Sequence, residues 1–144
     1  MYFFLINRLP YQTIFGGVSA MTRTQFQKVN GFSNKFWGWG GEDDDMSSRI
    51  RHHGYYICRY PVNVARYKML THQQQPANPQ RFALWKRGRM RIKTDGLNTL
   101  QYNVKELNQS KLYTRILVEL ATPSWWSALA KLWLGNWALD QWNA

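Results

Sequence analysis

Residues 37–45 read Trp-Gly-Trp-Gly-Gly-Glu-Asp-Asp-Asp, and no other run constrains this chain as strongly. Four of the chain's eight carboxylates lie side by side in it, although the formal net charge is +11. Adjacent like charges repel one another unless a cation or a shared proton compensates them. Tryptophan rings can stack on the apolar face of a sugar, carboxylates can accept hydrogen bonds from its hydroxyl groups, and glycines let the backbone approach closely. The run therefore suits carbohydrate binding combined with acid–base chemistry.

The length and composition indicate one folded domain or a piece of one. A chain of 144 residues is long enough for a core, and 8 Trp, 8 Tyr and 7 Phe argue against disorder. The basic excess predicts attraction to anions, such as a sugar nucleotide, an acidic lipid or nucleic acid. We expect no nucleic acid partner, because the chain contains no known base-reading motif.

Much of the basic charge lies in one short stretch, which contains Lys86, Arg87, Arg89, Arg91 and Lys93. The run is either the solvated face of a helix or an anion-binding site. The sequence leaves both interpretations open.

Three features bear on the compartment. Cys58 is the only cysteine, so an internal disulfide is excluded. Asn108-Gln109-Ser110 is an acceptor sequence for N-glycosylation, which would suit a luminal protein. The apolar residues 1–6 are too few for a signal peptide or a membrane span, so we expect no targeting segment in this chain.

Local patterns predict a mixture of helices and strands, in an α/β or α+β arrangement. Thr22 and Gln25 have the spacing of a capping box, which predicts a short helix ending at Val29. A second helix is predicted from Glu42 to His53, since its acidic start and basic end both suit the helix dipole.

Alternation of apolar and polar residues, together with turn signals, predicts the remaining elements. These are a turn and short strand over 13–21, strands over 55–59, 66–70, 97–104 and 112–120, a loop over 71–79 and a helix over 81–93.

The last stretch of the sequence places six large apolar residues on one helical face: Trp125, Trp126, Leu129, Trp133, Leu134 and Trp137. Such a helix either packs on the rest of the protein or lies on a membrane surface. The stretch has few charges to attract an acidic membrane, which favours packing.

Several blocks of the sequence together resemble the β-1,4-galactosyltransferases of animals. The blocks are Leu9-Pro10-Tyr11, Phe15 to Ala20, Phe26 to Phe32, Phe36 to Asp45, His72, Asn78 to Phe82, Asp95 to Asn98 and Leu112 to Thr114. They keep the order and approximate spacing of that family from about residue 9 to residue 124. The run from Phe36 to Asp45 is the most specific of them.

This resemblance implies an α/β protein with a GT-A fold, present here as its carboxy-terminal half. The expected division is an unassigned start (1–8), the carboxy-terminal part of a galactosyltransferase catalytic domain (9–124) and an unassigned Trp-rich tail (125–144). The family's nucleotide-binding half and its Asp-x-Asp metal motif do not precede the matching region. The resemblance further implies a type II membrane protein of the Golgi lumen, whose anchor is absent from this chain.

The implied reaction is inverting transfer of a sugar from a UDP-sugar donor to an acceptor ending in N-acetylglucosamine, on a glycoprotein or glycolipid. The resemblance assigns the role of general base to Asp43, with Glu42 supporting it near the donor and Asp44 bonding the acceptor sugar. Without the tryptophan and glycine residues before them, these carboxylates would be interpreted as an acidic helix start.

Further residues are implied on both sides of the reacting centre. The acceptor side contains Tyr11, Trp39, Gly40, Gly41, Asp44, Arg81 and Phe82, and the donor side contains Ile14, Trp39 and Glu42. Within these sets, Tyr11 and Trp39 resemble the aromatic platform under the acceptor, and the pair at 81 and 82 resembles the residues that close over its N-acetyl group. Trp85 departs from the family's usual aliphatic residue.

The resemblance also implies a manganese ion, Mn²⁺, with Met69 and His72 as two of its ligands and a third, an aspartate, expected upstream of this chain. Spacing alone would have identified Met69 as a core residue and His72 as a surface histidine. A thioether ligand runs against the usual preference of Mn²⁺ for hard donors.

Ile14 stands where vertebrate galactosyltransferases generally have tyrosine. A smaller aliphatic side chain leaves room for an N-acetyl group on the donor sugar, and invertebrate relatives with isoleucine prefer UDP-N-acetylgalactosamine. The resemblance therefore favours UDP-GalNAc over UDP-Gal as donor, whereas on its own Ile14 would be an ordinary strand residue.

Two other functions compete with an active transferase. The chain could be an inactive, sugar-binding fragment that lacks the nucleotide-binding half. It could also be a basic module that binds anions or membranes without catalysis.

Overall fold

The computed structural model describes residues 11–61, 63–65, 73 and 75–121. The chain divides into two compact units, residues 1–100 and 101–144, and each is described by itself. The predicted domain borders at residues 8/9 and 124/125 lie outside the described residues, as do the predicted strand over 66–70 and the Trp-rich tail.

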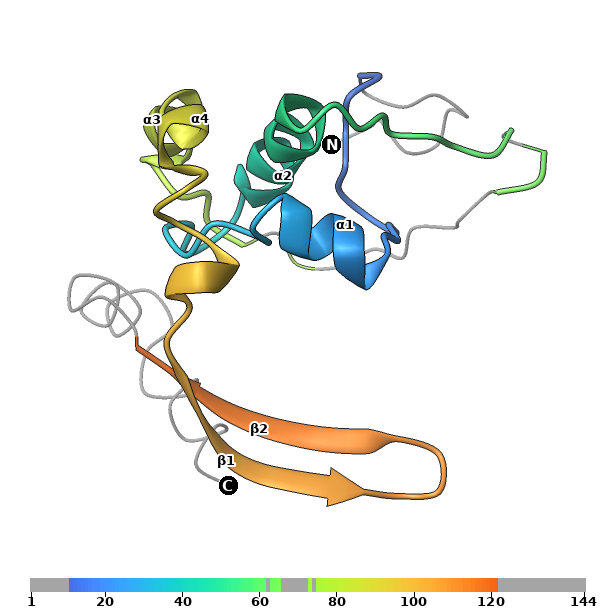
Figure 1. Ribbon diagram of the computed structural model, residues 1–144, viewed down its shortest axis with the longest axis vertical. Coiled ribbons are helices and arrows are strands. Elements are labelled where there is room, and N and C mark those ends of the chain that lie inside the picture. The colour runs from blue at the N-terminus through green and yellow to red at the C-terminus, as the bar shows by residue number, and fades with distance from the viewer. Residues whose placement is uncertain (1–10, 62, 66–72, 74, 122–144) are drawn as a thin grey trace. The chain divides into compact units, whose positions relative to one another are not determined.

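The described residues of the first unit form four α-helices and a short 3₁₀ helix. They are α1 (Arg23–Lys28), α2 (Glu42–His52), α3 (Arg81–Lys86), α4 (Gly88–Arg91) and η1 (Leu97–Thr99). Helix α2 lies between α1 and the α3–α4 pair, and it contacts both α3 and α4 (Figure 1). The residues that resemble an active site lie around the start of α2.

Helix α1 confirms the predicted capping box. The Thr22 hydroxyl accepts a hydrogen bond from the Gln25 amide, and the Gln25 side chain accepts one from the Thr22 amide. These two bonds satisfy amides that otherwise lack a partner at a helix start. The chain leaves the helix through Asn30 and Gly31, both with φ near +60°.

Helix α2 is the longest helix described, and its extent agrees with the prediction to within one residue. All four acidic residues of the run lie in its first turn, and basic residues occupy its last. Gly41 precedes it with φ 95°, a left-handed conformation that favours glycine. No side chain caps the start, so carboxylates next to the free amides are the main electrostatic complement there.

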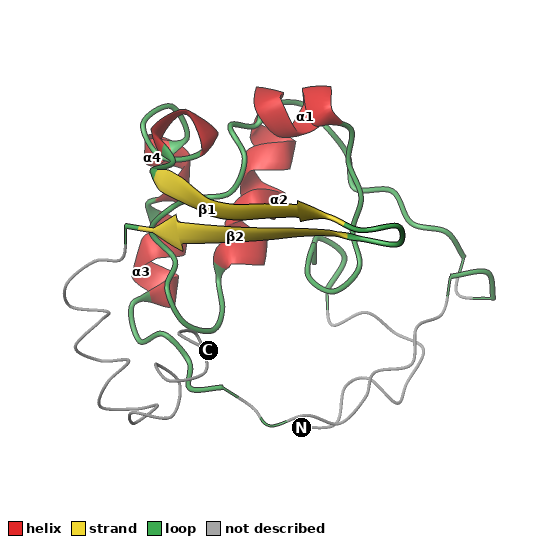
Figure 2. Cartoon of the chain, turned by 90° about the horizontal axis from the view of Figure 1, so that it is seen from below, coloured by secondary structure: helices red, strands yellow, loops and turns green. Residues whose placement is uncertain are grey.

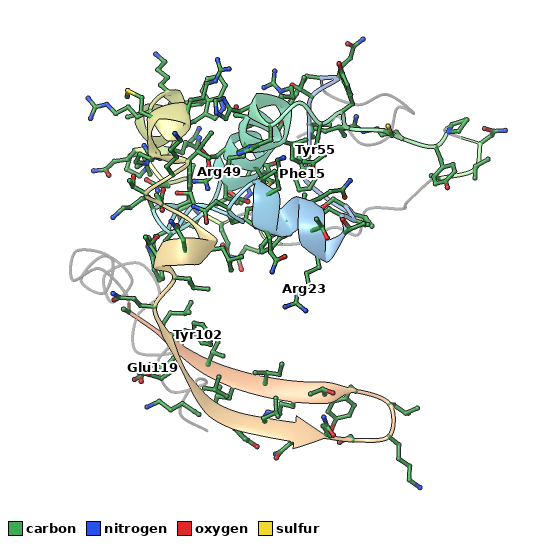
Figure 3. All side chains as sticks on the ribbon, viewed as in Figure 1. Phe15, Arg23, Arg49, Tyr55, Tyr102 and Glu119 are labelled. Atoms are coloured by element: carbon green, nitrogen blue, oxygen red, sulfur yellow. The ribbon has the colours of Figure 1, made fainter. Side chains whose placement is uncertain are left out.

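The apolar core of this unit is small. Val29, Met46 and Ile50 are buried, and the side chains packed on them are Phe15, Met21, Phe26, Tyr55 and Ile57. Arg49 lies in the interior among the helices (Figure 3) and is fully buried. A charged side chain inside so small a core needs charged partners, which are described below.

Three predictions for this unit are wrong. The single helix over 81–93 is instead two helices, since the chain changes course at Arg87, and Gly88 packs directly against Asp45. Residues 55–59 form no strand, although Tyr55 and Ile57 do turn inward to the core. A strand needs a hydrogen-bonding partner, and the described residues provide none there. The short strand within 13–21 is likewise absent, while the bend at Gly16 and Gly17 is present.

The second unit contains an antiparallel hairpin of β1 (Tyr102–Gln109) and β2 (Thr114–Leu120) (Figure 2). The strand predicted over 112–120 is confirmed nearly in full. The one predicted over 97–104 is confirmed only at its end, because residues 97–99 form the 3₁₀ helix instead. No helix among the described residues is long and apolar enough to cross a membrane.

Candidate active site

A glycine-rich loop delivers the start of α2 against the start of α3. Gly38, Gly40 and Gly41 all have positive φ. A Cβ at Gly41 would lie 2.9 Å from the Phe36 ring and 3.2 Å from the Cβ of Arg81. The loop can therefore pass this close to Phe36 and Arg81 only where it has no side chains. This explains why the predicted acceptor-side positions 40 and 41 are glycines.

The helix distributes the four acidic residues over different environments. Successive residues in an α-helix point about 100° apart, so adjacent carboxylates diverge. Glu42 is exposed, Asp43 and Asp44 are half-buried, and Asp45 is buried with 1% of its surface exposed. The four carboxylates therefore lie in three different surroundings and do not form one acidic cluster.

Asp43, the predicted general base, lies against the backbone of Gly16. A Cβ at Gly16 would be 2.4 Å from the Asp43 Oδ2 atom, so only glycine allows this approach. The other oxygen, Oδ1, accepts a hydrogen bond of 2.9 Å from the Asp44 amide. These contacts hold the carboxylate in one orientation.

Asp44 and Tyr11 form a pair. The Tyr11 hydroxyl donates to Asp44 Oδ1 over 2.6 Å, a short distance typical of a bond to a charged acceptor. Partial burial, this hydrogen bond and the charges of Asp44 and Asp43 raise the pKa of Tyr11 above its ordinary value. The phenol is therefore held as a neutral donor beside two carboxylates.

Three other predicted acceptor residues, Trp39, Arg81 and Phe82, lie together and are called the aromatic platform from here on. Tyr11, which was predicted to share a platform with Trp39, is bonded to Asp44 as described above. The Arg81 guanidinium carbon lies 5.7 Å from the Trp39 ring centre and 4.5 Å from that of Phe82. Both distances allow attraction between a cation and a π-system. Trp39 is 47% exposed and Phe82 62% exposed, so ring surface remains free for a ligand.

Asn78 joins this platform to the glycine-rich loop. Its amide donates to the Trp39 carbonyl over 2.9 Å, and its side-chain Nδ2 donates to the Trp37 carbonyl over 2.8 Å. Residues 39 and 77 also form an isolated parallel β-bridge. Two segments about forty positions apart in the sequence are thus held side by side.

Ile14, the predicted donor-side residue, is half-buried in a segment anchored on both sides. The Arg59 guanidinium donates to the carbonyls of Gln12 and Ile14, over 3.0 Å in the case of Gln12. The Ser47 hydroxyl, on α2, donates to the Thr13 carbonyl over 2.6 Å. The segment from Tyr11 to Ile14 is therefore tied to the helix that carries Asp43.

Beneath the site, Asp45 and Arg49 form a buried ion pair. Arg49 Nε lies 2.7 Å from Asp45 Oδ2, and Arg49 Nη2 lies 3.6 Å from Asp95 Oδ2. Burial raises the pKa of Asp45 above its ordinary value, although the hydrogen bond and charge of Arg49 act against it. Asp45 is thus a structural residue, and this one carboxylate of the acidic run is compensated by a cation from its own helix.

The predicted metal ligands, Met69 and His72, lie outside the described residues. The described part of the chain contains no group of three His, Cys, Asp or Glu side chains that could hold a metal ion. The manganese site therefore stays a prediction.

The structure brings most of the predicted residues together in two groups near the start of α2. Tyr11, Asp43 and Asp44 form one group, and Trp39, Gly40, Gly41, Arg81 and Phe82 form the other. Glu42 is exposed. The chemical roles of all these residues stay predictions.

Several supporting residues were not predicted from the sequence. Gly16, Ser47, Arg59 and Asn78 have the contacts described above, yet none lies in a pattern that specifies such contacts. Only Asn78 carries a usable signal, because asparagine directly before proline often begins a turn.

Comparison with known proteins agrees with the motifs. A family model described as the N-terminal domain of galactosyltransferase matches residues 5–73. β-1,4-Galactosyltransferase 2 of Cricetulus griseus is 43% identical over 122 residues, which are 83% of this chain and 33% of that protein. β-1,4-Galactosyltransferase 1 of Mus musculus is 44% identical over 118 residues, which are 80% of this chain and 30% of that protein. The chain spans about a third of the length of these curated relatives.

Among solved structures, the catalytic domain of Drosophila β1,4-galactosyltransferase 7 in complex with xylobiose is similar. It has a TM-score of 0.56 and 22% identity, over 78% of this chain and 52% of that chain. At that identity the likeness concerns the fold alone, and it confirms the predicted GT-A type fold in partial form. The sequence matches show that this chain belongs to the β-1,4-galactosyltransferase family.

Proposed function

We propose that the protein containing this chain is an inverting glycosyltransferase. It transfers galactose or N-acetylgalactosamine from a UDP-sugar, in β1-4 linkage, to terminal N-acetylglucosamine on a glycoprotein or glycolipid. Family membership supports this proposal. The observation that carries it is the half-buried pair Asp43 and Asp44, with Tyr11 bonded to Asp44 and the aromatic platform packed on the glycine-rich loop just before the same helix.

In the proposed reaction, an acceptor hydroxyl attacks the anomeric carbon of the donor from the face opposite UDP. The new glycosidic C–O bond forms as the bond to the diphosphate oxygen breaks, which inverts the configuration. The hydroxyl proton passes to the Asp43 carboxylate. This carboxylate is already oriented by its contacts with Gly16 and with the Asp44 amide. Asp44 binds the acceptor by accepting a hydrogen bond at Oδ2, since Tyr11 occupies Oδ1.

The platform supplies the acceptor's binding surface. The exposed Trp39 ring can stack on the sugar, and Arg81 and Phe82 can lie over the N-acetyl group. Glu42, exposed beside Asp43, serves as a supporting residue near the donor.

We also propose Mn²⁺ as cofactor, on the strength of the resemblance alone. Its chemistry would be to neutralise the charge on the diphosphate as UDP leaves. Met69 and His72 are its proposed ligands, and no step of the reaction is derived through the metal because both lie outside the described residues.

For the donor we propose UDP-GalNAc in preference to UDP-Gal. Ile14 lies in a segment whose backbone carbonyls are bonded by Arg59 and by Ser47, so its backbone has a defined position. At that position isoleucine occupies less space than tyrosine and has no hydroxyl group. An N-acetyl group on the donor sugar can use this space.

The test is a transfer assay on the full natural protein with a disaccharide acceptor ending in N-acetylglucosamine. The wild type is expected to use UDP-GalNAc better than UDP-Gal, and Ile14→Tyr to reverse that order. A hydroxyl contact typically contributes about 1 kcal/mol, so the ratio of kcat/KM values is expected to shift by roughly fivefold. Equal kcat/KM values for UDP-Gal and UDP-GalNAc in the wild type contradict the donor assignment. Absence of transfer from both donors contradicts the enzyme assignment.

A second candidate function is binding of N-acetylglucosamine without transfer. The residues on the proposed acceptor side all belong to this chain and are assembled within it, which favours this candidate for the chain alone. Quenching of tryptophan fluorescence by the disaccharide, without any transfer by the full natural protein, would support it over the enzyme.

For the location we propose the Golgi lumen, as part of a type II membrane protein. The sequon at Asn108 allows a direct test, because modification there requires entry into the secretory pathway. A glycosidase-induced mass shift that Asn108→Gln abolishes would support a luminal position.

A further inference from the structure

Asn78 is buried, with 4% of its surface exposed, and it belongs to neither of the proposed reacting groups. A buried amide side chain is costly unless its polar atoms find partners. The Nδ2 atom donates to the Trp37 carbonyl over 2.8 Å, and the Oδ1 atom accepts from the Gln80 amide over 2.8 Å. The side chain is therefore bonded on one side to the glycine-rich loop and on the other to the turn that precedes α3.

The backbone of Asn78 repeats this bridging pattern. Its amide donates to the Trp39 carbonyl over 2.9 Å, and its carbonyl accepts from the Arg81 amide over 3.2 Å and from Arg81 Nη1 over 3.3 Å. Two of the three platform residues, Trp39 and Arg81, are thus direct hydrogen-bond partners of Asn78. The third, Phe82, follows Arg81 on α3.

The same contacts relate the platform to the start of α2. Gly41 lies directly before α2, and a Cβ on it would touch the Cβ and carbonyl oxygen of Arg81. Asp43 follows Gly41 by two residues. Movement of the 77–82 segment away from the glycine-rich loop would therefore change the spacing between the platform and Asp43.

We propose that Asn78 is a positioning residue that fixes the aromatic platform against the Trp37–Gly41 loop and so sets the acceptor's position relative to Asp43. The kinetic part of this inference rests on the proposed transferase function. The structural part does not, because it depends only on the bonds from Asn78 to the two segments.

The test uses Asn78→Asp in the full natural protein. Aspartate keeps the oxygen that accepts from the Gln80 amide, but it cannot donate to the Trp37 carbonyl and places a negative oxygen against it. Asn98→Asp is the matched control: Asn98 also donates from Nδ2 to a backbone carbonyl, that of Lys93, and accepts at Oδ1 from Asn30.

Asn78→Asp is expected to raise the acceptor KM by about fivefold to tenfold, the effect of one lost hydrogen bond, with donor KM and kcat changed by less than about threefold. Asn98→Asp is expected to leave the acceptor KM within about twofold. An acceptor KM in Asn78→Asp that matches Asn98→Asp would overturn the inference. If Asn78→Asp does not fold, Asn78→Ala, which introduces no charge, is held to the same criterion.

Hydrogen exchange separates this inference from the proposed function. In Asn78→Asp the amide of residue 78, which donates to the Trp39 carbonyl across the two segments, is expected to exchange faster, while the amide of residue 80, whose acceptor oxygen is kept, and those in the middle of α2 keep their protection. This result supports the positioning role even if the wild type transfers no sugar. Unchanged protection at the amide of residue 78 overturns it, whatever the activity.

Discussion

The two faces of α2 put the same residue type to opposite uses. On one face, Asp43 and Asp44 are half-buried and bonded to a phenol and to the helix's own backbone. On the other, Asp45 is enclosed by Arg49, Gly88 and the Asp95 turn. Three adjacent aspartates thus divide into a candidate site and a structural ion pair.

This difference teaches that surroundings rather than residue type separate the two roles. A buried carboxylate needs a fixed cation, and such a pair contributes to the architecture only while both partners remain. A half-exposed carboxylate keeps water and ligands as partners, so it remains available for proton transfer. Substitutions on the two faces should therefore affect different measurements.

The largest expected effects come from one substitution on each face of α2, Asp43→Asn and Arg49→Met, compared in kcat and in the free energy of unfolding. Asp43→Asn removes the proposed proton acceptor, so kcat is expected to fall by about 10²–10⁴-fold. Its free energy of unfolding should change by less than about 1 kcal/mol, because asparagine can still accept from the Asp44 amide.

Arg49→Met is expected to have a large effect on the free energy of unfolding and a small one on the kcat of the folded protein. It leaves the carboxylates of Asp45 and Asp95 buried without their shared cation, which costs about 3–5 kcal/mol of unfolding free energy. Urea denaturation of the full natural protein measures this cost, and initial-rate kinetics measure the activity of the folded fraction. The comparison breaks if Asp43→Asn keeps the wild-type kcat, or if Arg49→Met unfolds at the wild-type urea concentration.

A smaller effect tests the buried face through Gly88. An added Cβ would lie 2.0 Å from Asp45 Oδ1, and Asp45 cannot yield because Arg49 holds it. Gly88→Ala is therefore expected to lower the unfolding free energy by about 1–3 kcal/mol, against the usual gain from alanine in a helix. Arg89→Ala, at the next and exposed position, is the control and should stay within about 0.5 kcal/mol. A stabilised Gly88→Ala would contradict the close contact.

The smallest effect concerns the open face, through Tyr11→Phe. Loss of the hydroxyl that bonds Asp44 is expected to raise the acceptor KM by about threefold to tenfold, with less than about 1 kcal/mol of stability lost at so exposed a position. An unchanged acceptor KM would show that this pair does not contribute to binding.

The same residue gives a pH prediction. The pKa of Tyr11 is raised in the folded state, so its contribution to stability is fully present below about pH 10, the unfolded value, and is lost as the pH rises through the folded value. Spectrophotometric titration should show one late-ionising tyrosine in the wild type and none of that kind in Tyr11→Phe.

The sequence predicted those parts of the fold that depend on near neighbours. The capping box of α1, the extent of α2 and most of β2 are confirmed, since a cap, a dipole complement and an alternating pattern all act within a few residues. The sequence blocks that resemble the family also contain the residues of the two groups near the start of α2.

Predictions that needed a distant partner were less successful. The helix over 81–93 breaks at Arg87, where Gly88 meets Asp45 from another helix. Residues 55–59 have the composition of a strand, but among the described residues no neighbouring strand bonds to them. Asn78 lay inside a matching block, yet its bonds to Trp37 and Trp39 are visible only in three dimensions.

By itself the sequence determined the family, the helix that bears the acidic run and the chemistry its carboxylates can perform. Only the tertiary structure decided which aspartates stay half-exposed and which one is enclosed. The reason is physical: the charge state and the role of a carboxylate depend on its burial and on nearby charges. Asp45 is buried against Gly88, and Asp95 shares its cation, Arg49; Gly88 and Asp95 both lie more than forty positions away in the sequence.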